Sequence, residues 1–270
     1  MSNEKAFWRA WLEGRAERSG ASENSGPRAE DPLEAGLESL SQFESGKSAA
    51  KSKRGRRETF GEEIGNSITH GVMAIFVLCM LPLAAVRAYI GAPAGKEVLD
   101  SDSVSIFCIS IFLMFLASTV YHAMSPATKH KMVMNRIDHI MIFVAIAGTY
   151  TPICLSVIGG TLGIVLTILQ WALVVAGALF KSLMFSKTPL SYILTISIYL
   201  LMGWMVVLCL PVLFQGATTA AFWLILAGGI CYTSGVVSFF MKFPFAHMVW
   251  HFLVDAGAIC HFIAIVFFLR

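Results

Sequence analysis

Long apolar runs, each about as long as a membrane is thick, dominate the chain from residue 66 to its end. A helix needs about 20 apolar residues to cross the ~30 Å hydrocarbon core of a bilayer. Seven such runs cover roughly residues 66–90, 103–124, 137–158, 161–181, 189–210, 218–240 and 246–269. Because hydrocarbon offers the backbone no hydrogen-bond partners, each run must be helical. The sequence therefore predicts an all-α membrane protein, a seven-transmembrane helix bundle, with kinks at Pro82 and Pro152.

The composition excludes an ordinary soluble domain. Of the 270 residues, 56% are hydrophobic and 14% are charged, whereas a soluble domain carries about 25% charged residues. The six cysteines all fall inside apolar runs and form no C-x-x-C pair, so we interpret them as small buried hydrophobic residues. They are Cys79, Cys108, Cys154, Cys209, Cys231 and Cys260. Neither a disulfide framework nor a thiolate metal site is expected.

The first 57 residues differ from the rest of the chain. They are rich in Glu, Ser, Gly, Lys and Arg, which predicts a disordered, charged cytoplasmic tail (1–57) ahead of a transmembrane domain (58–270). Within the tail, the aromatic and basic residues 7–12 could lie on a membrane surface. Residues 31–40 have the start signal and leucine spacing of a short amphipathic helix. Transient helix is the alternative for both segments.

Basic residues lie mostly on one side of the predicted spans. If the N-terminus is inside, the inside flanks hold Lys51, Lys53, Arg54, Arg56, Arg57, Lys129, Lys131, Arg136, Lys181, Lys187 and Lys242, and the outside flanks hold Arg87, Lys96 and Arg270. This asymmetry predicts a cytoplasmic N-terminus and an outside C-terminus. It also assigns the net charge of +3 to membrane topology, so no nucleic-acid partner is expected.

Three histidines lie at the inner ends of two predicted spans. His122 is in the second span, and His247 and His251 are one helical turn apart in the last. Two imidazoles at this spacing can bind one zinc ion, and a third from another helix completes a ligand set with one position open for water. The pair alone is a weak signal, and the sequence does not show that these spans are neighbours. Matched depth nevertheless predicts an intramembrane zinc site.

Two further polar residues lie at the same predicted depth. Asp138 begins the third span and could take or orient the proton of a zinc-bound water. Ser118 is one turn from His122 on the same helix face, and could donate a hydrogen bond to that water or to a substrate carbonyl. We therefore predict catalytic roles for Asp138 and Ser118.

Four other polar residues extend this region. Glu62, Asn66 and His70 form a stripe entering the first span, which is either a polar helix entrance with capping character or a second shell or gate to the zinc chamber. Asp255 lies one turn beyond the last-span histidines, and either accepts a proton from an imidazole or lies in a watered cavity. The remaining histidines are expected to be one solvated loop residue and two bundle residues: His130, His139 and His261.

Four sequence blocks together resemble the haemolysin III family, the bacterial branch of the progestin and adipoQ receptor group. The blocks are Glu62-Glu63-x-x-Asn66-x-x-Thr69-His70-Gly71, Ser118-x-x-Tyr121-His122, Asp138-His139 running to Ala147-Gly148-Thr149-Tyr150-Thr151-Pro152, and His247-x-x-x-His251 running to His261-Phe262. The resemblance implies zinc held by His122, His247 and His251. It also implies an inside N-terminus and a place in the bacterial inner (plasma) membrane.

The resemblance extends to individual roles and to activity. Asp138 matches the family's aspartate that holds the zinc-bound water, and Ser118 its nearby serine, whereas Asp255 departs from a usually apolar position. The wider superfamily resembles alkaline ceramidases, which favours a zinc-dependent hydrolase of lipid amide or ester bonds, with membrane lipid as its partner. Two alternatives stay open: a membrane-homeostasis sensor or receptor with structural zinc, and a cytolysin (haemolysin). The substrate, the oligomeric state and whether the chain is an enzyme at all stay open too.

Overall fold

The computed structural model describes residues 58–126, 128–183 and 188–269. Every regular element in these ranges is a helix, and seven helical segments are long and apolar enough to cross a membrane. They span Phe60–Gly91, Glu97–Ala123, Lys129–Ile158, Gly160–Leu183, Leu190–Gly216, Thr219–Phe240 and Ala246–Phe268. The prediction of an all-α, seven-span membrane protein is therefore confirmed. The predictions for residues 1–57 fall outside the described ranges, and the orientation of the termini stays a prediction.

The first three helices of the described residues begin several residues before the apolar runs. These helices are α3 (Phe60–Gly91), α4 (Glu97–Ala123) and α5 (Lys129–Pro152). Their first turns are polar, and the first turn of α3 carries Glu62 and Glu63. Hydropathy marks only the part of a helix that meets hydrocarbon, so it misses these turns. The additional turn of α3 matters for function because it lies at the histidine end of the bundle, the end where α4 finishes and α10 (Ala246–Ile263) starts.

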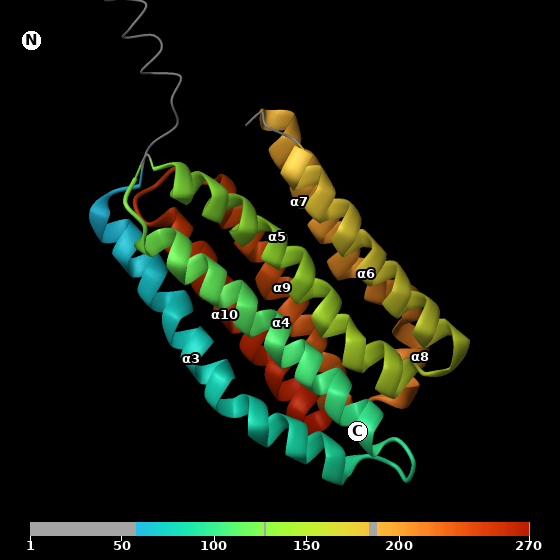
Figure 1. Cartoon of the computed structure of the whole chain (residues 1–270). Helices are drawn as coiled ribbons and strands as arrows, with labels where there is room; N and C mark the ends of the chain where they lie inside the picture. Colours follow the sequence, from blue (N-terminus) through green and yellow to red (C-terminus); the bar gives the residue numbers. More distant parts are fainter. Residues whose placement is uncertain (1–57, 127, 184–187, 270) are drawn as a thin grey trace, which may run out of the picture. The chain divides into compact units, whose positions relative to one another are not determined.

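Both prolines inside the predicted spans mark departures from a straight α-helix. α3 bends along its length in Figure 1, and Pro82, which has no N–H to donate, lies within it. Pro152 ends α5, and the chain continues as the π-helix η1 (Ile153–Ile158) before α6 (Gly160–Leu183). α6 approaches η1 closely, because a Cβ added at Gly163 would lie 2.1 Å from the Cys154 carbonyl oxygen. A glycine is required at that crossing.

The fifth span is interrupted rather than continuous. It consists of α7 (Pro189–Trp204), the 3₁₀-helix η2 (Met205–Cys209) and α8 (Leu210–Gly216). The Tyr150 hydroxyl donates to the Gly203 carbonyl (2.7 Å) and accepts from the Val206 N–H (2.6 Å). Gln170 donates to the Met202 carbonyl (3.0 Å). Side chains from α5 and α6 thus satisfy backbone groups that hydrocarbon could not.

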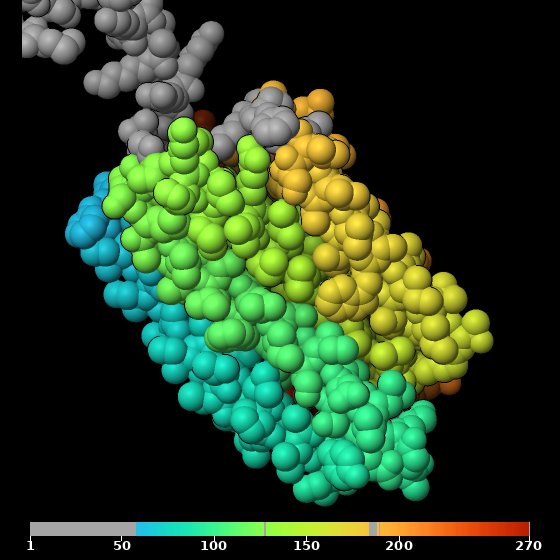
Figure 2. Space-filling model, viewed as in Figure 1, coloured from blue at the N-terminus to red at the C-terminus, as the bar shows by residue number. Residues whose placement is uncertain are grey.

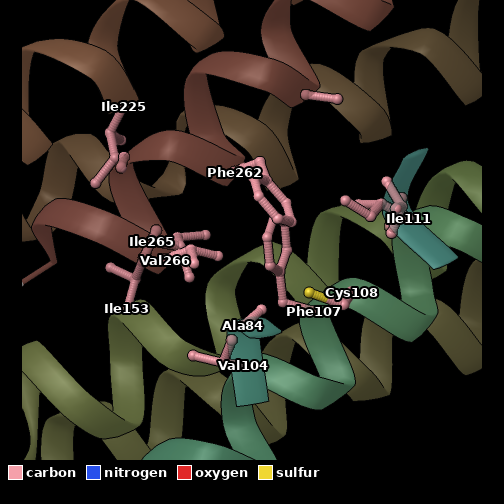
Figure 3. Close-up of a cluster of buried hydrophobic side chains, with 14 of the residues drawn as sticks. Ala84, Val104, Phe107, Cys108, Ile111, Ile153, Ile225, Phe262, Ile265 and Val266 are labelled. Carbon is pink, nitrogen blue, oxygen red and sulfur yellow. The ribbon is translucent and has the colours of Figure 1, made fainter. Parts of the chain in front are cut away.

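The helices pack so that α3 contacts both α4 and α10. α4 also packs against α5, α5 against α6, and α10 against α9 (Thr219–Phe240). On the face shown in Figure 2, α3, α4, α5 and α6 lie in chain order. Figure 3 shows part of the buried core, where Phe107 of α4 and Phe262 of α10 are near neighbours, with ring centroids 6.3 Å apart. The second and last spans therefore approach each other beside the first.

The cysteine prediction is confirmed in part. All six cysteines are free thiols, and Cys108, Cys154 and Cys209 are buried. Cys79 is exposed, and Cys231 and Cys260 are half-buried, so for these three the expectation of full burial was wrong. A cysteine side chain is apolar enough to face either lipid or a protein core. An apolar run in the sequence does not show which of the two it faces.

Candidate metal centre

Three imidazole rings meet at the histidine end of the bundle. The ring centroids of His122 and His247 are 5.1 Å apart, those of His122 and His251 5.0 Å, and those of His247 and His251 4.9 Å. One nitrogen from each ring can be chosen so that all three lie within 4.8 Å of one another. The rings come from α4 and from two successive turns of α10. They form a candidate metal-binding group, as the sequence suggested.

His122 is oriented by a carboxylate on the neighbouring helix. Its Nδ1 lies 2.8 Å from Glu63 Oε2, and Glu63 Oε1 accepts a bond of 2.6 Å from Lys131 Nζ. A carboxylate can only accept, so Nδ1 carries the proton and Nε2 keeps its lone pair. That Nε2 is buried and has no hydrogen-bond partner among the described residues. A carboxylate–histidine pair of this kind commonly orients a metal ligand.

His251 is held in the same tautomer by the backbone of α3. Its Nδ1 lies 3.1 Å from the Asn66 carbonyl oxygen and 3.2 Å from Thr69 Oγ1. The Thr69 hydroxyl itself donates to the Asn66 carbonyl (3.0 Å), so its oxygen can accept from the imidazole. His251 is almost fully buried, with 1% of its surface exposed. Its Nε2 is thereby left as the nitrogen with a free lone pair for a metal.

His247 and His122 share a second carboxylate, that of Glu58, which precedes α3. Glu58 Oε1 lies 3.6 Å from His247 Nδ1, and Glu58 Oε2 lies 3.7 Å from His122 Nδ1. Asn66 Nδ2 donates to Glu58 Oε2 (3.2 Å). Partial burial, with the nearby charges of Glu63 and Glu62, raises the pKa of Glu58 to about 7. Ionising Glu58 beside these two carboxylates therefore costs free energy, and a bound cation would lower that cost.

Glu62 has the capping character that the sequence analysis left open. α3 begins with a capping box, in which the Thr59 hydroxyl accepts from the Glu62 N–H (3.3 Å) and Glu62 Oε2 accepts from the Thr59 N–H (2.8 Å). The other carboxylate oxygen, Oε1, accepts from the Phe245 N–H (2.7 Å) just before α10. Glu62 thus joins the starts of two helices.

The predicted catalytic pair is brought together on adjacent helices. Asp138 of α5 receives a hydrogen bond from the side chain of Ser118 on α4, and Ser118 is buried one turn from His122. Asp138 Oδ2 also lies 3.7 Å from Nδ1 of its neighbour His139. The catalytic roles of these residues stay predictions.

Two further polar residues pair one turn deeper in the bundle. The His70 ring stacks on His251, with centroids 3.7 Å apart and an angle of 10° between planes. His70 Nε2 lies 3.7 Å from Asp255 Oδ1, and both atoms are buried with no hydrogen-bond partner in the part of the chain described. The structure therefore places Asp255 beside His70, whose ring stacks on His251.

The remaining histidines are not members of the candidate metal-binding group. His130 is exposed. His139 donates through Nδ1 to the Asn135 carbonyl on its own helix (2.6 Å). His261 donates through Nε2 to the Ile225 carbonyl of α9 (3.0 Å). The bond of His261 to α9 agrees with the bundle role expected of it, whereas the bond of His139 lies within its own helix.

Comparison with known proteins identifies the family. Residues 59–262 match the family described as Haemolysin-III related. The chain belongs to the haemolysin III family. It is similar to a protein named "Hemolysin-3 homolog" from Bacillus subtilis (strain 168), with 37% identity over 211 residues, or 78% of this chain and 95% of that protein. It is also similar to "Hemolysin-3" from Bacillus cereus, with 33% identity over 208 residues, or 77% of this chain and 91% of the relative.

In this haemolysin III family member, sequence reasoning missed three residues around the histidines. Glu58 lies in the polar flank of the first span, and Glu63 and Thr69 were noted only as parts of a motif. Their side chains nevertheless approach His122, His247 or His251. The available signal was the first span's helical spacing: Glu58, Glu62, Asn66 and His70 recur every four residues, and Thr69 follows Asn66 by three. Such spacing predicts one helix face, but not which helix that face meets.

Proposed function

We propose that this protein binds zinc through His122, His247 and His251 and uses it to hydrolyse amide or ester bonds of membrane lipids. The observation that carries the proposal is the convergence of three buried or half-buried imidazoles, two of them held with their Nδ1 protonated. Three imidazole nitrogens are a donor set of catalytic zinc sites, which keep a fourth position for water. The buried, unpartnered Nε2 of His122 fits such a metal.

The chemistry divides between the metal and the chain's own residues. Zinc in a site of this kind lowers the pKa of a bound water to about 7, which supplies hydroxide at neutral pH. Asp138 would accept and hold the proton that the attacking water releases. Ser118, which donates to Asp138, would hold that carboxylate in position to accept the proton, or would donate to a substrate carbonyl. The oxygens of Glu58 lie 3.6 and 3.7 Å from Nδ1 of His247 and His122. Its carboxylate would be a second acceptor for the proton that the water releases.

Metal content tests the first half of this proposal. Detergent-purified wild-type protein, His247→Ala and His130→Ala would be dialysed against trace zinc and analysed by mass spectrometry. We expect about one zinc per wild-type chain and per His130→Ala chain, because His130 is an exposed residue in the first turn of α5, and much less in His247→Ala. Equal zinc content in all three proteins would contradict the site.

Turnover tests the second half. Wild type, Asp138→Asn and His251→Ala would each be incubated with zinc and total membrane lipid, and loss of parent lipids and release of fatty acid would be followed. The proposal expects release by wild type alone. If zinc binds but no lipid amide or ester is consumed, the metal is structural and the protein is better understood as a membrane-homeostasis sensor. Its zinc would then fasten α4 to α10.

The location we propose follows from the topology prediction. The chain would reside in the bacterial inner (plasma) membrane with its histidine end toward the cytoplasm, so membrane lipid would reach the site from the inner leaflet. The sequence favours this orientation through the excess of Lys and Arg at that end.

A cytolysin is the second candidate, and the names of the two Bacillus relatives favour it. Purified protein added to dye-loaded liposomes would release the dye at low protein-to-lipid ratio if this candidate holds. A bundle with seven apolar spans is more typical of a resident membrane protein, so we expect no more leakage than with heat-denatured protein.

A further inference from the structure

The carboxylate of Glu62 accepts two backbone N–H groups that belong to different helices. Glu62 Oε2 accepts from the Thr59 N–H at the start of α3 (2.8 Å), and Glu62 Oε1 accepts from the Phe245 N–H at the start of α10 (2.7 Å). The side chain is buried, with 3% of the residue exposed. One carboxylate therefore joins two helix starts that lie more than 180 positions apart in the chain.

α10 needs such a partner because its own sequence supplies no cap. The residue at its N-cap position is Phe245, whose side chain makes no capping bond. Phe245 also has a left-handed backbone (φ 62°), the one non-glycine residue with positive φ among those described. The first N–H groups of a helix lack partners within it, and a negative charge near them is favourable. Glu62 satisfies both requirements from another helix.

The position of this contact links it to the histidines. His247 lies two residues after Phe245, and His251 lies one turn further along α10. The residue next to Glu62, Glu63, contacts His122 on α4 and Lys131 on α5. Adjacent carboxylates in the first turn of α3 thus face α10 and α4, the two helices that carry the candidate metal ligands.

We infer that Glu62 is a positioning residue for the metal: by capping α10 from α3, it fixes the register of His247 and His251 against His122. This inference rests on the proposed zinc site. It replaces the idea of a gate, because a gating side chain must move, whereas both oxygens of Glu62 are engaged and the residue is buried. Residues that orient metal ligands typically contribute about 10- to 100-fold to metal affinity.

Three variants separate positioning from general stability. Glu62→Gln removes the charge and one of the two acceptor oxygens. Glu62→Asp keeps the charge but is one methylene too short to span both N–H groups. Thr59→Ala is the matched control, because it removes the hydroxyl half of the α3 capping box and leaves the Phe245 contact intact. Losing an N-cap side chain typically costs about 1 kcal/mol of stability.

The readouts are cobalt and zinc affinity, by competition with a chromogenic chelator, the visible spectrum of the cobalt-loaded protein, and thermal unfolding without metal. We expect Glu62→Gln and Glu62→Asp to bind cobalt and zinc at least about tenfold more weakly, with an altered cobalt spectrum. Thr59→Ala should unfold at lower temperature yet keep wild-type affinity and spectrum.

Each other outcome has a definite meaning. Wild-type affinity in both Glu62 variants would overturn the inference while leaving the zinc site standing. Wild-type affinity in Glu62→Asp alone would also overturn it, since charge rather than reach would then matter. If Thr59→Ala lowers the cobalt affinity as much as Glu62→Gln does, the loss follows from destabilising α3 in general, and the inference fails. No cobalt binding by wild type would instead refute the proposed function. If Glu62→Gln does not accumulate, Glu62→Asp and Thr59→Ala still give the decisive comparison.

Discussion

Replacing Glu63 by alanine should weaken zinc binding by about one to two orders of magnitude. In the structure, Glu63 Oε2 accepts from the buried Nδ1 of His122 at 2.8 Å. A hydrogen bond to a charged acceptor is worth about 1.5–3 kcal/mol, and each 1.4 kcal/mol is about tenfold in affinity. The expected loss is therefore roughly 10- to 150-fold. Glu63→Gln keeps an oxygen acceptor without the charge, and should lose about half of that free energy.

The matched control is the other partner of the same carboxylate. Lys131 Nζ donates to Glu63 Oε1 (2.6 Å) and to the Met124 carbonyl (3.0 Å). Lys131→Met removes a positive charge near the site and leaves the Glu63–His122 bond, so zinc affinity should stay equal or rise. The assay is competition against a chromogenic chelator at pH 7 in detergent. Wild-type affinity in Glu63→Ala, or an equal loss in Lys131→Met, would refute the assignment of Glu63 to orienting His122.

Three further predictions follow from the packing, the metal site and the topology. Gly163→Ala should cost about 3 kcal/mol or more, because the new methyl group would lie 2.1 Å from the Cys154 carbonyl oxygen; Gly203→Ala, with nothing within 4 Å of the added Cβ, should be neutral or slightly stabilising in the same thermal assay. Zinc at about 1,000 times its dissociation constant should stabilise the wild type by about 4.1 kcal/mol, and a chelator should remove that gain, with no such effect in His251→Ala. A phosphatase reporter fused at the C-terminus should be active and one fused at the N-terminus inactive; the reverse would overturn the predicted orientation.

The sequence predicted the span architecture and the histidine group for the same physical reason. Apolar runs must be helices in hydrocarbon, and an imidazole within such a run stands out against its surroundings. The spacing of His247 and His251 put both on one face of one helix, and topology put His122 at matching depth. These inferences depend on helical spacing within a span and on the alternating direction of successive spans. Both can be worked out from a single sequence.

What the sequence could not give was the partner of each ring. Glu63 orients His122 only because α3 packs against α4, and the Asn66 carbonyl orients His251 only because α3 packs against α10. A backbone carbonyl leaves no compositional signal at all. Cys79 is a second example. Its apolar run was recognised correctly, but the neighbouring helices determine which face of α3 meets lipid, and Cys79 is exposed.

The charge balance at the histidine end gives an independent reason to expect a cation. Glu58 and Glu63 lie within reach of His122, and of these two carboxylates only that of Glu63 forms an ion pair with an ammonium group of the described residues, that of Lys131. Imidazoles bind metals as neutral donors, so they bring no compensating charge of their own. Partly buried like charges at this spacing repel one another strongly, because the surroundings screen them far less than water does. A divalent ion held by the three imidazoles would turn that repulsion into attraction, so carboxylates that destabilise the bundle without a metal should strengthen its affinity for one.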